Sequence, residues 1–350
     1  MSIHSLVFYI VDFLSCRCYN FYMPDTRDKN TICIHCFGTL DPKTGVCTTC
    51  NKRAELNNTM PYAIAPRTLL GGRYFIGLPL GRGGFGITYK AYDTILSTPV
   101  AIKEFFPKGY IQRLPSSLSF DLRNPETAKT FHYWLTAFVD EAKVLTSIKH
   151  LSGIVGIYDF FMTNSTAYLV MEYLDGLSLH RFMTDRGERL EFSEALSVLR
   201  PVFDTLSTLH RHGIIHKDIS PENIQIVDGQ TVKLIDFGAA SIYNKQISKP
   251  FFVLKKGYSP IELYYKDREQ GPWTDIYELG ATVYTCLVGK PPQEASERKK
   301  SDKLVPPSEL NIQIPPATEK ALLKALAVNP EDRFKTVDEF KAALYDETQN

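Results

Sequence analysis

The sequence predicts an α+β protein in which a small cysteine-rich module precedes one large two-lobed domain. Apolar segments typical of strands lie at residues 69–76, 99–103 and 168–174. Two longer segments, 131–149 and 192–212, have the amphipathic spacing of helices. Six of the seven cysteines come before Asn51, which separates them from the rest of the chain. At 350 residues the chain has room for both parts.

Composition is that of an ordinary globular protein. Hydrophobic residues make up 44% of the chain and charged residues 23%. A net charge of +1 argues against nucleic acid as a partner, because nucleic-acid-binding surfaces carry a basic excess. No apolar run approaches the ~18 residues of a membrane-spanning helix. We therefore expect no membrane segment and a cytoplasmic location.

The N-terminal stretch carries no recognisable signal. The apolar run Ser5–Leu14 is short and has no basic residue before it, which disfavours a secretory leader. We expect residues 1–30 to be a disordered extension. Residues 1–22 could even be spurious, and Cys16 and Cys18 would then have no role.

Two C-x-x-C pairs separated by ten residues follow, within the segment 31–53. A redox motif is the alternative for one such pair, but two in tandem favour a tetrahedral zinc site. The segment resembles the zinc ribbons of bacterial regulatory proteins. The expected Zn²⁺ ligands are Cys33, Cys36, Cys47 and Cys50. Residues 54–71, with Pro61 and Pro66 and little periodicity, are predicted to be a linker.

A glycine-rich turn lies between the first two strands of the large domain, at residues 80–86 (LGRGGFG). Dinucleotide-binding folds share the G-x-G-x-x-G pattern, but there it leads into a helix. Here it leads into a strand, and Val100-Ala-Ile-Lys103 forms the next strand. Glycines let backbone amides close over phosphates, and Lys103 adds a cation for the α- and β-phosphates.

The strongest chemical signal is His216-Lys-Asp218-Ile-Ser-Pro-Glu-Asn223, followed by Asp236-Phe-Gly. Phosphoryl transfer needs one carboxylate for the attacking hydroxyl, and an amide with a second carboxylate for Mg²⁺. The pair of motifs, H-x-D-x-x-x-x-N and D-F-G, resembles the catalytic core of the eukaryotic-like, bacterial-type serine/threonine protein kinases. Further matches to that family follow in order at residues 257–262, 274–280 and 329–334.

This resemblance implies a bilobal kinase fold over residues 72–346, with a β-rich N-lobe at about 72–172 and a helical C-lobe at about 175–346. It implies ATP- and Mg²⁺-dependent phosphorylation of a protein substrate, on Ser or Thr. Asp218 would be the catalytic base. Lys103 would clamp the phosphates, and Glu141 would position it. Asp140 is the other candidate for that partner, but the E-A-x-x-L context favours Glu141.

The same resemblance implies the nucleotide contacts. Met171 would be the gatekeeper, and the backbone at Glu172 and Leu174 would bind adenine. The full set is Leu80, Gly81, Gly83, Gly84, Gly86, Thr88, Ala101, Lys103, Met171, Glu172, Leu174, Asn223 and Asp236, the last two also holding Mg²⁺. Between Lys103 and Glu141 lie 37 residues, more than the family usually needs, so Phe105–Tyr110 belongs to an insertion.

Two positions depart from the family pattern together. Ser220 replaces the usual Lys two residues after the catalytic Asp, and Lys255 replaces a Thr that normally contacts that Lys. Either Lys255 compensates, as a catalytic residue, or it is a solvated lysine. Lys217 replaces Arg before Asp218, and the loop from Asp236 onward contains no Thr before residue 263. Activation by loop phosphorylation, at Ser241 or Ser248, is therefore not implied.

Two other functions compete with the protein kinase. A pseudokinase scaffold would use only the fold or nucleotide binding, yet none of the five core residues is missing. A small-molecule kinase shares the Asp and Asn, but generally lacks the motifs at 257–262 and 329–334.

Overall fold

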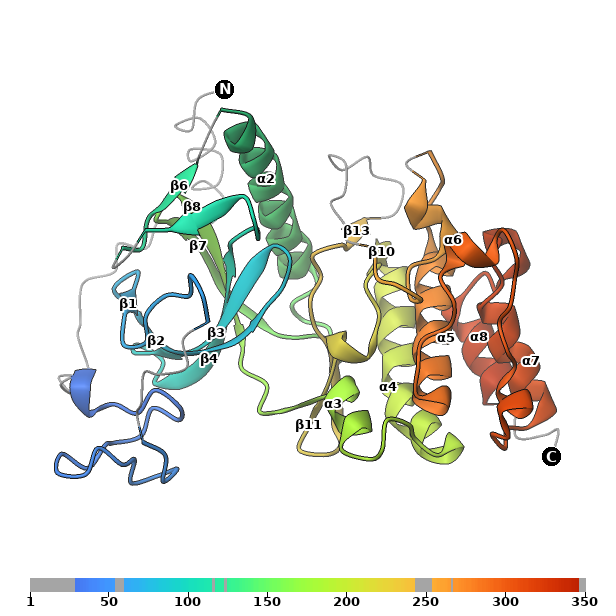
Figure 1. The fold of residues 1–350 in the computed structure, drawn as a ribbon, viewed down its shortest axis with the longest axis horizontal. Helices are drawn as coiled ribbons and strands as arrows, with labels where there is room; N and C mark the ends of the chain where they lie inside the picture. The colour runs from blue at the N-terminus through green and yellow to red at the C-terminus, as the bar shows by residue number, and fades with distance from the viewer. Residues whose placement is uncertain are drawn as a thin grey trace.

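The computed structural model describes residues 29–53, 60–114, 117–122, 125–242, 254–265 and 267–345. Most of the predicted extension over residues 1–30, with Cys16 and Cys18, lies outside this part of the chain, as does Ser248. Figure 1 shows a small module beside a sheet-rich lobe, with a helical lobe on the other side. Within the described ranges, no helix is long and apolar enough to cross a membrane.

The smaller lobe is built on an antiparallel sheet with strand order β1-β2-β3-β4-β8-β7. Its strands are β1 Leu69–Leu70, β2 Tyr74–Arg82, β3 Gly86–Asp93, β4 Thr98–Phe105, β7 Ile157–Thr163 and β8 Thr166–Glu172. Buried and half-buried residues alternate along much of β3, as expected where the two sheet faces differ in solvation. Because strand side chains alternate between faces, Lys103 and Glu104 of β4 point to opposite sides of the sheet.

Helix α2, Pro125–Ser147, packs against β7 and β8. The sequence placed this helix at 131–149, but it begins six residues earlier. Proline is favoured at the first helical position, and an acidic residue in the first turn, Glu126, suits the helix dipole. Phe131 and Phe138 meet Phe105 of β4 at ring-centroid distances of 5.2 and 5.5 Å. This packing fixes α2, and with it Glu141, relative to β4.

A hairpin is inserted between β4 and α2. Its strands are β5 Ile111–Arg113 and β6 Phe120–Leu122. Arg113 reaches back to the fully buried Glu104, with Nη2 2.6 Å from both carboxylate oxygens. The hydroxyls of Tyr89 and Tyr168 donate to the same carboxylate at 2.8 and 2.9 Å. The insertion expected after Phe105 therefore braces the face of β4 opposite Lys103.

The larger lobe is helical. Its helices are α3 Leu179–Thr184, α4 Phe192–Arg211, α5 Pro272–Val288, α6 Ala295–Arg298, α7 Pro316–Ala325 and α8 Val337–Leu344. Its strands are β9 Gly176–Ser178, β10 Ile214–Ile215, β11 Ile224–Val227, β12 Thr231–Leu234 and β13 Ser241–Ile242. Every residue of α5 from Thr274 to Leu287 is buried, as expected for a helix in the centre of a domain. The carboxylates of Asp275 and Glu278 must therefore find partners inside the protein.

A buried ion pair joins Glu262, at the end of the segment that follows Asp236, to Arg333, near the C-terminal end of the helical lobe. Glu262 lies in a 3₁₀ helix, Ile261–Tyr264, and Arg333 follows another, Pro330–Asp332. The two side chains are 0% exposed, and Nη1 and Nη2 of Arg333 lie 2.8 and 3.1 Å from the carboxylate oxygens. Breaking such a buried pair by removing one partner is strongly destabilising, so residues 254–262 have a fixed anchor.

The cysteine-rich module is a small ribbon after a 3₁₀ turn at Lys29–Thr31. Isolated antiparallel bridges join Ile32 to Thr39, Leu40 to Cys47 and Val46 to Arg53. At the turn, the Asp41 side chain accepts hydrogen bonds from the amides of Lys43 and Thr44 at 2.9 and 2.8 Å. Its own buried cluster consists of Cys33, Leu40 and Cys47, a smaller core than a domain usually needs to fold alone.

The ribbon docks on the outer side of β2 and β3 (Figure 1). Phe37 contacts Phe75 and Tyr92 at ring-centroid distances of 6.3 and 5.4 Å, and Phe37 and Phe75 are buried. Gly77 makes this approach possible. A Cβ on Gly77 would lie 2.7 Å from the carbonyl oxygen of Ile34 and 3.0 Å from the Phe37 ring. Backbone-to-backbone contact at this position therefore requires glycine.

Residues 60–70, within the predicted linker, also pack on the N-lobe. Ile64 is buried, and its amide donates to the Tyr89 hydroxyl at 3.0 Å. Tyr62 stacks on Phe106 with ring centroids 6.4 Å apart. The segment between the ribbon and the sheet is therefore linked to the buried Glu104 carboxylate, because the Tyr89 hydroxyl hydrogen-bonds to both Ile64 and Glu104.

Candidate active site

Helix α5 holds the loop that carries Asp218. Both oxygens of Asp275 accept backbone hydrogen bonds, from His216 at 2.9 Å and from Lys217 at 2.8 Å. Glu278 accepts from the amide of Ile219 at 2.8 Å. Lys217 has φ +63°, a conformation that non-glycine residues adopt only when their surroundings impose it. The buried acids of α5 supply that constraint.

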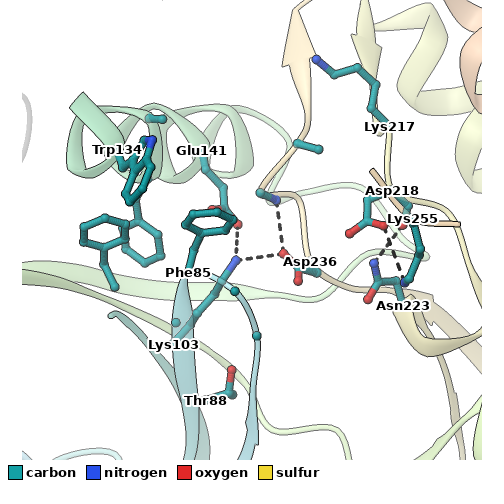
Figure 2. A pocket seen from close by; sticks show the side chains of 18 residues that line it. Phe85, Thr88, Lys103, Trp134, Glu141, Lys217, Asp218, Asn223, Asp236 and Lys255 are labelled. Atoms are coloured by element: carbon teal, nitrogen blue, oxygen red, sulfur yellow. Dashed lines mark hydrogen bonds and ion pairs between the residues drawn. The ribbon is translucent and has the colours of Figure 1, made fainter. Parts of the chain in front are cut away.

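Lys103 joins the two lobes. Its Nζ lies 2.9 Å from Glu141 Oε1 and 2.9 Å from Asp236 Oδ1, so β4, α2 and the segment after β12 meet at one ammonium (Figure 2). Burial opposes the charge on Lys103, but the two carboxylates outweigh it and raise its pKa. In turn Lys103 lowers the pKa of Asp236 to about 2. Both groups are therefore charged at neutral pH.

Asp218 and Asn223 lie on the opposite wall of the cleft. The Asn223 side-chain Nδ2 donates to the Asp218 carbonyl at 2.9 Å, which fixes the amide. Burial raises the pKa of the Asp218 carboxyl to about 6, against the opposing effect of Lys255. A carboxyl with a raised pKa, facing a cleft, suits proton transfer near neutral pH.

Lys255 approaches from the segment before Glu262. Its Nζ lies 2.5 Å from Ser220 Oγ, 3.1 Å from Glu222 Oε2 and 3.7 Å from Asp218 Oδ1. The two positions at which the sequence departs from the family pattern are thus in direct contact.

A cleft of about 330 Å³ collects these groups, within the size range of small-molecule sites. The turn between β2 and β3 forms one side. Its Gly84 and Phe85 carbonyls accept from the amides of Lys108 and Phe106 at 2.9 and 2.7 Å. The Phe85 ring meets Trp134 of α2 edge-on, with centroids 5.6 Å apart (Figure 2). The turn is therefore tied to both α2 and the residues that begin the insertion.

The structure brings ten of the residues singled out from the sequence to this cleft: Gly83, Gly84, Gly86, Thr88, Lys103, Glu141, Asp218, Asn223, Asp236 and Lys255. Six other residues of the expected nucleotide site do not line it: Leu80, Gly81, Ala101, Met171, Glu172 and Leu174. Ala101 and Met171 are nonetheless opposite each other on β4 and β8, so they share one region of the sheet.

Four aromatic side chains that line the cleft had no assigned role there. They are Phe85, Phe105, Trp134 and Phe138. Trp134 and Phe138 belong to the apolar face of α2, and the spacing of that face does not distinguish a core contact from a cleft wall.

The four cysteines of the ribbon form a second site. Their sulfurs lie within 4.8 Å of one another. Cys36 Sγ is 3.4 Å from Cys47 Sγ, and Cys33 Sγ is 3.8 Å from Cys50 Sγ. In each C-x-x-C turn a backbone amide points at the first sulfur: His35 at Cys33 and Thr49 at Cys47, both at 3.4 Å. Four converging sulfurs with such support fit a tetrahedral zinc ion.

Comparison with known proteins agrees with this geometry. Residues 74–343 match the protein kinase domain family. The chain belongs to that family. The apo form of PpkA-294 has the same kinase fold, with a TM-score of 0.71 and 34% identity, over 81% of this chain and 99% of that one.

Curated kinases of bacteria are similar over the same part of the chain. A probable serine/threonine-protein kinase of Clostridium acetobutylicum is 30% identical over 81% of this chain. The kinase PrkC of Bacillus subtilis is 30% identical and PknB of Mycolicibacterium smegmatis 29% identical, each over 79% of this chain. The chain spans only 40–43% of the length of these relatives.

Proposed function

We propose that the chain transfers the γ-phosphoryl group of ATP to a Ser or Thr hydroxyl of a protein substrate, with Mg²⁺ as cofactor. One observation carries the proposal: Lys103 contacts Glu141 and Asp236 at 2.9 Å each, across the same cleft that holds Asp218 and Asn223. The family and the names of the similar kinases support a protein acceptor.

The acceptor hydroxyl would bind beside Asp218. Its oxygen attacks the γ-phosphorus, and the bond from that phosphorus to the β,γ-bridging oxygen breaks. The bridging oxygen leaves with its electron pair on ADP, and the hydroxyl proton passes to the Asp218 carboxylate. Lys103 contributes charge at the α- and β-phosphates, held in place by Glu141.

The residues at the phosphate end fit the nucleotide. Among the described residues, no atom beyond the adjacent residues in the chain lies within 4 Å of a Cβ built on Gly81 or Gly83, so internal packing does not demand glycine there. Close approach of backbone to phosphate does demand it. Leu80, Gly84, Gly86 and Thr88 complete this half of the proposed ATP site. At the adenine end we assign Ala101, Met171, Glu172 and Leu174.

The donor set for Mg²⁺ is Asn223 and Asp236. Asn223 uses Nδ2 for the Asp218 carbonyl, which leaves its side-chain oxygen for a cation. Oxygen ligands of this kind, together with phosphate oxygens, suit Mg²⁺. When bound, Mg²⁺ would neutralise phosphate charge during transfer.

Two alternatives have less support. A pseudokinase would not need the complete set of Lys103, Glu141, Asp218, Asn223 and Asp236, which is present and assembled. A small-molecule kinase would not need the buried Glu262–Arg333 pair that anchors the segment beside the acceptor. Neither nucleic acid nor a membrane is part of the proposal, and the cytoplasmic location stays a prediction from the sequence.

The test is transfer from labelled ATP to generic protein acceptors and lysate proteins, with the acceptor residues identified by mass spectrometry. Asp218→Asn should abolish transfer, because the amide cannot accept the proton, while ATP affinity and thermal stability stay near wild type. Asp228→Asn, at an exposed turn, is the matched control and should remain active. Activity of Asp218→Asn within a fewfold of wild type would contradict the assignment.

For the ribbon we propose one structural Zn²⁺ held by Cys33, Cys36, Cys47 and Cys50. Structural zinc contributes on the order of 10 kcal/mol to the folding of such small modules. Protein purified without chelator should contain one zinc per chain, and chelation should unfold residues 31–53 while the kinase domain stays folded. Cys36→Ser should lose the metal, and Cys286→Ser, in α5, should keep it. Zinc-free protein with a folded ribbon would refute this site.

A further inference from the structure

The acceptor half of the cleft is rich in negative charge. Asp218 lines this side and Glu222 lies beside it, with Lys255 Nζ 3.7 and 3.1 Å from their carboxylate oxygens, and the transferring phosphoryl group is itself an anion. Among the described residues that line the cleft, the lysines are Lys103, Lys217 and Lys255. Within the part of the chain that the structure describes, a side-chain cation on the acceptor side of the cleft therefore comes from one of these three.

Two of the three lysines are directed elsewhere. Lys103 is engaged by Glu141 and Asp236 at the nucleotide side. The Lys217 side chain points away from Asp218, and its Nζ lies 3.3 Å from Gln270 Oε1 (Figure 2). Lys255 extends into the acceptor side, and its Nζ lies within 3.7 Å of Asp218 Oδ1.

Contacts at both ends of Lys255 hold this placement. Its amide donates to Ser259 Oγ at 2.8 Å, and its carbonyl accepts from the Ser259 amide at 2.9 Å. Gly257, with φ +80°, turns the chain between them, and a Cβ there would lie 2.6 Å from the Pro292 carbonyl oxygen. At the other end, Ser220 Oγ accepts from Nζ at 2.5 Å. The ammonium is positioned, although its side chain is 31% exposed.

We propose that Lys255 is a catalytic residue whose ammonium group contacts the oxygens of the transferring phosphoryl group. This inference rests on the proposed kinase function. Charge on those oxygens must be stabilised in the transition state, and preorganised cations make the largest contribution in such sites. Ser220 orients the ammonium, and its small side chain leaves room for a lysine that arrives from another segment.

A structural consequence follows from the origin of this lysine. Lys255 belongs to the segment that ends at the buried Glu262–Arg333 pair, whereas Asp218 and Asn223 belong to the loop that α5 holds. The catalytic charge is therefore complete only when residues 254–262 are seated against the C-lobe.

The kinetic test is Lys255→Thr, with Lys256→Thr as the matched control because Lys256 is 89% exposed. Loss of one transition-state contact should lower kcat about a hundredfold with little change in KM for ATP. Lys256→Thr should match wild type. Adding Ser220→Lys to Lys255→Thr should restore much of the activity, because the two side chains meet at 2.5 Å. A Lys255→Thr variant within a fewfold of wild type, or two effects that simply add, would overturn the proposal.

Chemical rescue covers the case in which the double variant does not fold. Lys255→Ala should regain activity when ethylammonium is added, since the site is open to solvent. No rescue, in a variant whose thermal stability equals that of wild type, would count against Lys255.

A binding measurement separates this proposal from the kinase function itself. Tetrafluoroaluminate with MgADP stands in for the transferring group. The affinity of Lys255→Thr for MgADP alone should equal that of wild type. Its affinity for MgADP together with tetrafluoroaluminate should be at least ~10-fold weaker than that of wild type. Equal affinity for the analogue would refute the role of Lys255 even if transfer is observed. A wild-type chain that transfers no phosphate would instead refute the proposed function, and the titration would still decide on Lys255.

Discussion

Removal of Arg113 is the sharpest test of the inserted hairpin. Arg113 is the guanidinium partner of Glu104, and the side chains of the pair are 6% and 0% exposed. In Arg113→Met the methionine keeps much of the side-chain volume but provides no charge and no donor. Glu104 would keep the hydroxyls of Tyr89 and Tyr168, while its charge would remain buried without a cation.

The magnitude follows from that burial. Removing one partner of a buried ion pair costs about 3–5 kcal/mol, because the remaining charge is uncompensated. Domains are stable by only about 5–15 kcal/mol, so the loss should consume a large part of the N-lobe's stability. A double variant that adds Glu104→Gln to Arg113→Met removes the buried charge and keeps a side-chain carbonyl that can accept the tyrosine hydrogen bonds. At least half of the loss should therefore be recovered in the double variant.

Urea unfolding followed by Trp134 fluorescence measures this directly. The chain has two tryptophans, and Trp273→Phe leaves Trp134 as the reporter, in ring contact with Tyr110 near the hairpin at 4.3 Å. Arg186→Met is the control, since its ion pair with Glu194 is exposed and such pairs contribute only about 0–1 kcal/mol. An Arg113→Met midpoint equal to that of the control would refute the argument from burial.

Three further outcomes are expected. Gly77→Ala should separate the ribbon from the sheet, because the added Cβ would lie 2.7 Å from the Ile34 carbonyl oxygen. Hydrogen exchange of the Phe75 amide should then accelerate. Unchanged protection of that amide would refute the contact. Asp218 must be ionised to accept a proton, and burial raises its pKa to about 6. We therefore expect kcat/KM for ATP to fall about tenfold per pH unit below that value and to level off above pH ~7. A flat profile down to pH ~5 would contradict this. Arg333→Met should cost about 3–5 kcal/mol in thermal unfolding, with recovery in the presence of Glu262→Gln; a silent change would mean that the pair is not buried in solution.

The sequence predicts best what depends on local chemistry. The sequence predicts that one phosphate-binding cleft contains the glycine-rich turn, Lys103, Asp218, Asn223 and Asp236. These motifs occur in the order in which phosphoryl-transfer enzymes of this family combine them. The sequence leaves two alternatives for Lys255, compensation for Ser220 or a solvated lysine. The structure adds that the two side chains, 35 residues apart, lie 2.5 Å from each other.

Long-range packing is what the sequence could not supply. Arg113 follows the segment that the sequence assigns to an insertion, and nothing local indicates that it turns back to a buried Glu104. Phe85 and Trp134 meet because α2 packs beside the glycine-rich turn, a long-range arrangement that the sequence does not indicate. The linker prediction missed Ile64 for the same reason: its burial depends on Tyr89, 25 residues away.

The docked ribbon has a practical consequence for anyone who shortens this protein. Phe75 is 2% exposed in the complete arrangement, and Phe37 is among the side chains that cover it, next to Tyr92. A fragment that begins at the first strand of the kinase domain would expose the rings of Phe75 and Tyr92 to water on the outer face of β2 and β3. Exposed apolar patches promote self-association, so the shortened domain should be less soluble than the full chain. Replacing Phe75 and Tyr92 with polar residues should then restore its solubility.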